Sequence, residues 1–378
     1  MFAGLLACGE SGQPHATTAA RPETKQGPTT SPSTQAPEVR SAVRCAECHE
    51  PYVRTWEASA HADAARSPYY QALGGGKDRR CAACHTPLRG ALDGDDPIHD
   101  EGITCDACHG VTAVASTPRD PGLTFDLVSN RKYGPLCDSK DHYFHRVGCS
   151  QLFTESRFCG ACHHLEWPAR GGGAALPVIT DFAEWSASDA RGSTSCQECH
   201  MSGEPGEVAR GWDPRDKVSR HDLLGDGRGL LGDAVDLEAR AVTEGAERWI
   251  EVEVSNRGAP HSIPAGLAGR RLVLRAEFVD AKGDALPLRE ERVYARVLVD
   301  KVGAEVPFTR AVAVAEDSRL GPGERRVERF RVPDGASAAK LSVERLALAP
   351  TVAAALGVDA PVAESIAGAD VALTSDDR

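Results

Sequence analysis

Five segments of the chain repeat the pattern Cys-x-x-Cys-His, which holds two thiols and an imidazole within five residues. In chain order, motifs one to five are Cys45–His49, Cys81–His85, Cys105–His109, Cys159–His163 and Cys196–His200. In this pattern the two thiols form thioether bonds to a haem, and the histidine ligates its iron. Roughly 0.02 matches are expected by chance at these cysteine and histidine frequencies. The sequence therefore predicts five covalently bound haem c groups.

The predicted attachment and ligand residues follow directly from the motifs. The thioether cysteines are Cys45, Cys48, Cys81, Cys84, Cys105, Cys108, Cys159, Cys162, Cys196 and Cys199. The iron ligands on the attached side are His49, His85, His109, His163 and His200. Zinc is the alternative, because paired Cys-x-x-Cys units also build zinc sites. Zinc gives no reason for a histidine directly after every second cysteine, so the motifs favour haem.

Length and composition limit the class of protein. A chain of 378 residues is long enough for two or three domains. Aromatic residues make up only 5% of it, so the haem-binding part is expected to fold around cofactor and to have little regular structure. The net charge of −12 argues against nucleic acid and favours encounters with basic patches on redox proteins. No stretch approaches the roughly eighteen apolar residues of a membrane helix.

Three cysteines lie outside the motifs. Cys137 and Cys149 are twelve residues apart in one predicted loop, and the sequence indicates a disulfide between them or two buried thiols. Cys8 ends Leu5-Leu6-Ala7-Cys8, which resembles the lipidation signal of bacterial lipoproteins. The seven residues before it are too few for a signal peptide, so the alternative is an unrelated apolar stretch. We expect residues 1–40 to combine a truncated lipoprotein signal with a disordered tether rich in Pro, Thr and Ser.

The region 41–230 contains all five motifs. Tyr52 begins a stretch, 52–66, whose composition predicts a helix that ends before Pro68. On that helix Tyr52, Trp56 and Ser59 share one face, whereas His61 lies off it and is free to reach a neighbouring haem. Trp185 and Ser188 repeat the same spacing with Ala190 in place of the histidine. The second copy indicates either an internal duplication or a shared packing requirement.

The ordered motifs resemble the multihaem cytochromes of the cytochrome c-554 and hydroxylamine oxidoreductase superfamily. The resemblance covers about residues 41–265 and rests on four segments. They are 48–62 (C-H-x-x-x-Y/V-x-x-W-x-x-S-x-H-A, with Val53 at the Y/V position), 102–110 (GITCDACHG), 158–163 (FCGACH) and 184–201 (E-W … C-H-M). It implies an irregular and α-helical cytochrome region with closely packed haems that form an electron wire. It also implies two histidine ligands on most irons.

Eight histidines remain for the second ligand position, and methionine is nearly excluded because the chain has only Met1 and Met201. The resemblance favours His61, His145, His221 and His261, with His142 as the alternative to His145. For the fifth iron, His99 and His164 compete. Ligation by two histidines predicts low potentials, since a methionine ligand is what raises the potential of cytochromes c.

Residues 231–378 have a different sequence pattern, without cysteines. Apolar and charged residues alternate in Trp249–Val254, and similar segments follow at 272–278, 293–299, 326–332 and 341–348. Turn signals separate them, and a short helix is predicted near 351–356. We therefore expect an all-β immunoglobulin-like sandwich, with His261 on a loop that reaches a haem.

These observations predict a periplasmic or cell-surface electron-transfer cytochrome, lipid-anchored in a bacterial membrane, whose partners are other redox proteins. The alternative is a reductase or oxidase of small nitrogen or sulfur compounds, which needs one open iron. The resembling nitrite and tetrathionate reductases bind their active haem through C-x-x-C-K, whereas all five motifs here end in histidine. A third possibility is a binding module in which the sandwich docks a partner.

Overall fold

The computed structural model describes residues 37–92, 94–223 and 229–373. Cys8 and the predicted tether before residue 37 therefore lie outside the described residues. Residues from Pro37 onward form one unit. None of the helices among the described residues has the length and apolar character needed to cross a membrane.

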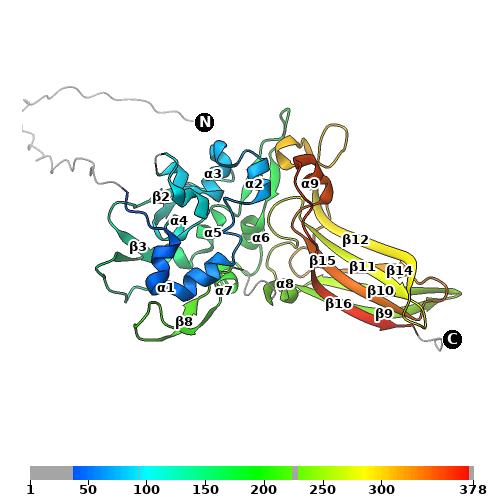
Figure 1. The fold of residues 1–378 in the computed structure, drawn as a ribbon. Coiled ribbons are helices and arrows are strands. Elements are labelled where there is room, and N and C mark those ends of the chain that lie inside the picture. The colour runs from blue at the N-terminus through cyan, green and yellow to red at the C-terminus, as the bar shows by residue number, and fades with distance from the viewer. Residues whose placement is uncertain (1–36, 93, 224–228, 374–378) are drawn as a thin grey trace, which may run out of the picture. The chain divides into compact units, whose positions relative to one another are not determined.

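Short helices carry the five motifs, as Figure 1 shows. These are α1 (Ala42–Glu57), α3 (Arg79–His85), α4 (Cys105–His109), α5 (Ser156–Gly160) and α7 (Cys196–His200). In a helix, positions i, i+3 and i+4 share one face, so the two thiols and the imidazole point to the same side in motifs two, three and five, whose helices contain the whole motif. In motif four, α5 ends at Gly160, before Cys162 and His163, and in motif one His49 has non-helical backbone angles. Side-chain caps define where these helices begin. Ser195 and Glu198 form a capping box on α7, and Asp78 accepts a hydrogen bond from the Arg80 N–H on α3.

The rest of this region is irregular. Two further helices are α2 (Pro68–Ala72) and α6 (Asp181–Ala187), and four pairs of short strands connect the motifs. The pairs are β1 (Val111–Val114) with β2 (Leu123–Phe125), β3 (Arg131–Gly134) with β4 (Arg146–Cys149), β5 (Leu165–Trp167) with β6 (Leu176–Ile179), and β7 (Gly203–Gly206) with β8 (Arg215–Ser219). The β3–β4 pair is parallel. A small buried apolar cluster, Leu88, Ile98, Ala107 and Leu127, lies here, and the largest cluster lies in the C-terminal region.

The C-terminal region contains two antiparallel sheets (Figure 1). The three-stranded sheet has the order β14 (Arg325–Arg331), β10 (Glu247–Asn256), β9 (Val235–Glu244). The five-stranded sheet has the order β13 (Ala313–Asp317), β12 (Ala285–Val299), β11 (Arg271–Val279), β15 (Ala338–Leu346), β16 (Glu364–Ala372). Two helices, α8 (Gly229–Ala234) and α9 (Pro350–Leu356), flank the strands.

One apolar core joins the two sheets. Ile250, Val252 and Val254 alternate along β10 and are fully buried, and they pack with Phe278 of β11 and Phe330 of β14. The intervening residues of β10 are charged and point outward, where Glu251 and Glu253 pair with arginines of neighbouring strands. This alternation is the pattern that predicted the strands, because a half-buried strand has one apolar face. The C-terminal region is therefore a two-sheet β-sandwich, and the expected combination of a helical, irregular first region with a β-rich second region is confirmed.

Two expectations for local structure need correction. The helix predicted over 52–66 is part of α1, which starts ten residues earlier and ends at Glu57. It ends there because the Ser59 N–H donates to the Trp56 carbonyl, three residues back. The Ser59 hydroxyl then accepts a hydrogen bond from the Ala62 N–H, and a separate turn begins. The sequence also missed three strands of the sandwich, β9, β13 and β16, and the short strands β1 to β8 of the first region.

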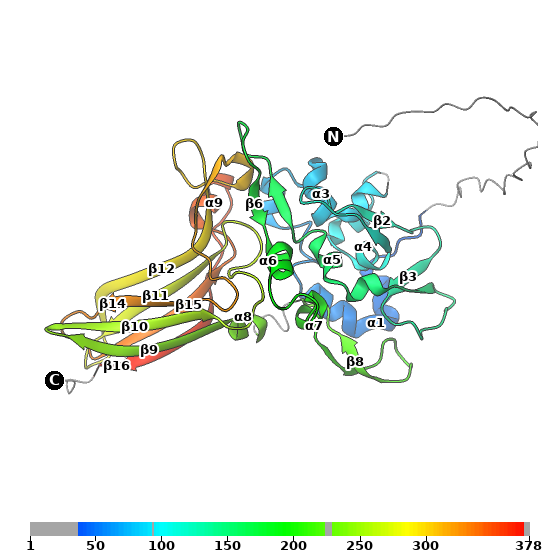
Figure 2. The ribbon, with the colours of Figure 1, turned by 180° about the vertical axis from the view of Figure 1, so that it is seen from behind.

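The sandwich contacts the first region through several elements. Trp167 of β5 packs edge-on against Phe308, with ring centroids 5.0 Å apart, and Val178 of β6 joins the same buried cluster. Leu298 of β12 completes this contact. After β6 the chain forms α6, which packs against α5 (Figure 2). These contacts place α6 where its side chains reach both a motif and the sandwich.

Candidate haem-binding site

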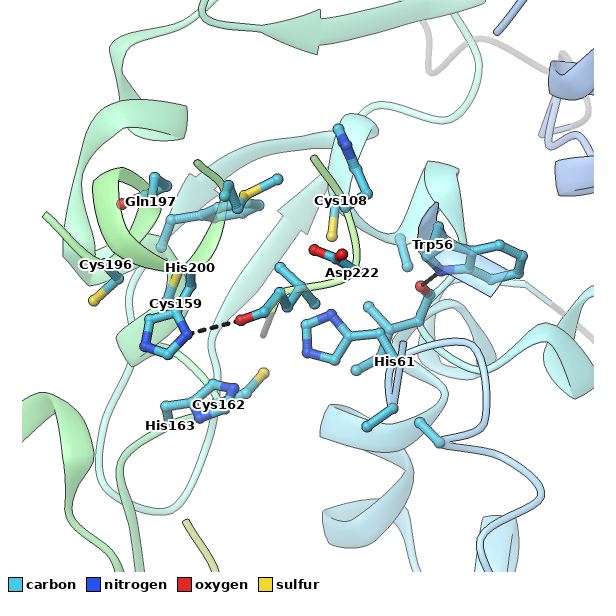
Figure 3. A pocket seen from close by; sticks show the side chains of 18 of the residues that line it. Trp56, His61, Cys108, Cys159, Cys162, His163, Cys196, Gln197, His200 and Asp222 are labelled. Carbon is cyan, nitrogen blue, oxygen red and sulfur yellow. Dashed lines mark hydrogen bonds between the residues drawn. The ribbon is translucent and has the colours of Figure 1, made fainter. Parts of the chain in front are cut away.

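All five motifs line one cavity of about 1530 Å³. Its wall includes all ten motif cysteines and the five histidines that follow them. Figure 3 shows part of this space, with the thiols of Cys108 and Cys162 and the rings of His61, His163 and His200 around it. A region with few apolar clusters of its own is therefore built around a shared cavity.

Thiols of different motifs lie in contact, which establishes which motifs are neighbours. Cys45 of motif one lies close to Cys105 of motif three. Cys84 of motif two contacts Cys162 of motif four, and Cys159 of motif four contacts Cys196 of motif five. Motif four therefore lies between motifs two and five.

Four of the motif histidines hydrogen-bond to backbone carbonyls through Nδ1. The acceptors are Val208 O for His49 (2.6 Å), Ala64 O for His85 (3.1 Å), Tyr133 O for His109 (2.6 Å) and Leu223 O for His200 (2.8 Å). A carbonyl only accepts, so each Nδ1 carries the proton. The Nε2 lone pair is then free toward the cavity, which is the tautomer and orientation that a metal-ligating histidine needs.

His163 of motif four has a different neighbour. Its Nδ1 lies 3.6 Å from Oδ2 of Asp181, the first residue of α6. Burial alone would lower the pKa of His163, but the Asp181 carboxylate outweighs it and the pKa is raised. Burial would likewise raise the pKa of Asp181, whereas His163 and the Gly266 N–H lower it to about 2. The sequence analysis did not single out Asp181.

Four further histidines face the motif histidines across the cavity. The ring centroids are 6.2 Å apart for His49 and His145, 6.3 Å for His163 and His61, 6.2 Å for His109 and His221, and 6.3 Å for His200 and His261. A metal–nitrogen bond of about 2.0 Å and the roughly 1.1 Å from a ring nitrogen to the ring centre separate two imidazoles on one metal by about 6.2 Å. The four spacings fit one iron between each pair of rings.

The protonation states and charges of the buried side chains in the cavity also fit a haem iron and its propionates. Burial first, and then His163 and His85, lower the pKa of His61 to about 3, and burial and His109 lower that of His221 to about 4. Both rings are thus neutral near pH 7, as an imidazole ligand must be. Arg270 also lines the cavity, burial lowers its pKa, and no carboxylate of the described residues lies within ion-pair distance of it. A haem propionate would supply that partner.

Among the residues that the structure describes, no second histidine ring is paired with His85. Among the described residues, the ring in contact with His85 is Tyr70, which stacks on it at 4.5 Å and 9°. His164 lines the cavity, but its ring contact is with Phe182 at 6.4 Å. His99 does not line the cavity; it is 2% exposed, and neither ring nitrogen has a hydrogen-bond partner in the described part of the chain. The structure thus brings neither predicted candidate opposite His85.

The remaining predicted residues lie as follows. Cys137 and Cys149 form a disulfide, which closes the loop that contains both His142 and His145. His142 stacks on Tyr143 and Phe144, whereas His145 faces His49. Among the described residues, no group of three or more His, Cys, Asp or Glu side chains is arranged to hold a single metal ion, which is the arrangement that the zinc alternative requires.

The repeated Trp–Ser spacing has a structural counterpart. Trp56 donates from Nε1 to Ile103 O, two residues before Cys105, and Trp185 donates to Thr194 O, two residues before Cys196. Both indoles therefore anchor the start of a motif helix that belongs to another segment. A shared packing role accounts for the repeat.

Side chains of α6 hold the loop that carries His261. Glu184 accepts a hydrogen bond from the Ser262 N–H at 2.8 Å, and Asp181 accepts from the Gly266 N–H at 2.8 Å. Glu184 also pairs with Arg319 at 2.6 Å, and Asn256 donates to His261 O at 2.8 Å. The position of His261 is therefore set from both the sandwich and the first region.

Comparisons with known proteins relate the chain to multihaem cytochromes. The family model described as "Cytochrome c554 and c-prime" matches residues 44–110. Among solved structures, the chain is similar to a penta-heme cytochrome c552 from Thermochromatium tepidum, with 20% identity and a TM-score of 0.69, covering 88% of this chain and 99% of that chain. The resemblance to multihaem c-type cytochromes is thus confirmed, and the fold extends through the sandwich.

A second structural match is weak. A protein described as ApaA, from Bordetella pertussis, matches with 13% identity and a TM-score of 0.20, covering 37% of this chain and 93% of that chain. So low a score supports no conclusion about this chain. A search of curated proteins finds no match.

Proposed function

We propose that the chain is a pentahaem c-type cytochrome that transfers electrons between redox proteins. The observation that carries this proposal is the spacing of four histidine pairs, each 6.2–6.3 Å between ring centroids, in a cavity that all five motifs line. When bound, the haems supply one-electron chemistry. The chain attaches them through ten cysteines, orients its imidazoles toward them and encloses them in one cavity.

Four irons are then held by two histidines each, the pairs being His49 with His145, His163 with His61, His109 with His221, and His200 with His261. Ligation by two imidazoles favours low potentials. The thiol contacts support an order in which motif one adjoins motif three, and motif four adjoins motifs two and five. Cys108 of motif three interacts with Cys159 and Cys162, which connects the two groups through motif four.

A second function is favoured by the surroundings of His85. No described histidine faces it, so the iron of motif two keeps one position open. An open iron can bind a small substrate, as a reductase or oxidase of nitrogen or sulfur compounds requires. The other four haems would then deliver electrons to, or remove them from, this site.

Electron paramagnetic resonance of the oxidised holoprotein tests both functions. Integration of the signals should give four low-spin irons and one high-spin iron. Five low-spin irons would exclude the open site and leave the electron carrier. Two or more high-spin irons would contradict the histidine pairs. Turnover of nitrite, hydroxylamine and tetrathionate, measured on the same sample, then tests the second function.

We further propose a periplasmic or cell-surface location and a lipid anchor at Cys8. Haem c attachment fits an extracytoplasmic compartment, and Leu5-Leu6-Ala7-Cys8 supports the anchor. Replacing Cys8 by Ser in a full-length secreted precursor should move the protein from the membrane to the soluble fraction. Unchanged fractionation would contradict the anchor. The charge of −12 favours partners with a basic docking surface.

The sandwich is proposed to be immunoglobulin-like and to begin near residue 231. Its first, second and sixth strands share one sheet, and its third, fourth, fifth, seventh and eighth strands form the other. This split of successive strands between two facing sheets supports the assignment.

A further inference from the structure

The motif histidines differ in what their Nδ1 atoms face. In four of the five motif histidines, Nδ1 faces a neutral backbone carbonyl. In the fifth, His163, Nδ1 lies 3.6 Å from a carboxylate oxygen. That carboxylate belongs to Asp181, whose side chain is 14% exposed. Motif four is therefore distinguished from the other motifs by one charged neighbour.

The position of Asp181 is fixed from two sides. Its Oδ1 accepts from the Gly266 N–H at 2.8 Å, which leaves Oδ2 directed at His163. The Phe182 N–H donates to the His163 carbonyl at 3.1 Å, so the start of α6 is attached to motif four itself. A side chain held by these contacts keeps its orientation toward the imidazole.

A carboxylate beside Nδ1–H makes an imidazole a stronger electron donor than a carbonyl does. A stronger donor stabilises ferric iron relative to ferrous iron and lowers the reduction potential. The Arg270 guanidinium nearby donates to Ala265 O at 3.0 Å and offsets part of the negative charge, but it does not contact Nδ1.

We propose that Asp181 is a positioning residue for His163 that lowers the reduction potential of the motif-four iron below those of the other three irons with two histidines. This inference rests on the proposed pairing of His163 with His61. It has a consequence for electron flow, because motif four adjoins motifs two, three and five. An electron that moves between these motifs passes through the motif-four iron. Since that iron has the lowest potential, the electron is more stable on the iron of a neighbouring motif.

The experiment is a redox titration of the holoprotein followed by electron paramagnetic resonance. The low-spin signal that disappears in His61→Ala identifies the motif-four iron. In the wild-type protein this signal should titrate at the lowest potential of the four low-spin signals. Any other rank would overturn the inference, and this measurement does not depend on how an Asp181 variant folds.

Asp181→Asn removes the charge but keeps an oxygen for the Gly266 N–H. Its motif-four signal should shift to higher potential and change its g values, while the other three stay in place. Asp181→Glu, which restores the charge, should return the potential toward the wild-type value. Asp189→Asn is the matched control, because it removes an exposed carboxylate just two residues beyond the end of α6; the motif-four potential should not change.

Failure of this inference is distinguishable from failure of the proposed function. If His61→Ala removes no low-spin signal, the pairing is wrong and the inference falls with it. If His61→Ala removes one signal, but that signal keeps its potential and g values in Asp181→Asn, the pairing stands and the role of Asp181 is wrong.

Discussion

The rings of His200 and His261 lie with their centroids 6.3 Å apart and their planes 19° from parallel. His200 ends the fifth motif, whereas His261 lies on the loop between β10 and β11 of the sandwich. In the proposed pairing, the second region would thus provide the second ligand of an iron held in the first region. The sandwich therefore takes part in building the cavity.

Replacing His261 by Ala should convert one low-spin iron to high-spin while four motifs keep their surroundings. The reason is that Asp181 and Glu184 bond to the backbone of this loop, at Gly266 and Ser262, and not to the imidazole. Electron paramagnetic resonance gives the count. His142→Ala is the control, since His142 stacks on Tyr143 and Phe144 and faces no motif histidine; it should leave the count unchanged.

Replacing Glu184 by Gln should lower the free energy of unfolding by about 1–3 kcal/mol, because a charged hydrogen bond between the regions is lost while Arg319 keeps Asp317. Burial would raise the pKa of Glu184, but Thr180 and Arg319 hold it below the ordinary 4.5. A depressed carboxyl pKa contributes stability that is full above pH 4.5 and is lost as pH falls through the lower value.

Urea denaturation at several pH values tests this. The difference between wild type and Glu184→Gln should be constant above pH 4.5 and shrink below it. A difference that does not depend on pH would contradict the role of the charge. Glu253→Gln, which removes an exposed pair with Arg325, should have no measurable effect.

Replacing His99 by Leu should leave the spin count unchanged and should maintain or raise the free energy of unfolding. His99 is buried outside the cavity with both ring nitrogens unpartnered in the described part of the chain, so an apolar side chain removes a desolvation cost. Denaturation and the resonance spectrum are measured together. A new high-spin iron would instead make His99 the ligand of the motif-two iron.

Replacing both Cys137 and Cys149 by Ser should lower the free energy of unfolding by about 2–3 kcal/mol, as the loop is no longer closed covalently. The loop carries His145, so part of the motif-one iron should become high-spin at elevated temperature. On the denatured, unreduced wild-type holoprotein, a thiol reagent should find neither cysteine reactive. Two reactive thiols would contradict the disulfide.

Sequence patterns predicted most of the architecture, since the motifs and the alternating strands are local signals. They did not predict which histidine faces which motif, because each facing ring comes from a segment 61 to 112 residues away along the chain, and its position depends on loop geometry. His99 was preferred to His164 in the sequence, yet of the two only His164 lines the cavity. Asp181 escaped notice because a single carboxylate before Glu184 and Trp185 has no distinguishing spacing.

The histidine pairs also impose an order on maturation of the chain. His61 precedes His163, so it has already been exported when motif four emerges. The partners of His49, His109 and His200 come later in the chain, the last of them in the sandwich. In the proposed holoprotein, an apparatus that attaches haems as the chain arrives would complete motif one when His145 arrives and motif four next, at His163. Motif five would remain half-ligated until residue 261 has crossed the membrane, which makes the sandwich the final step of assembly.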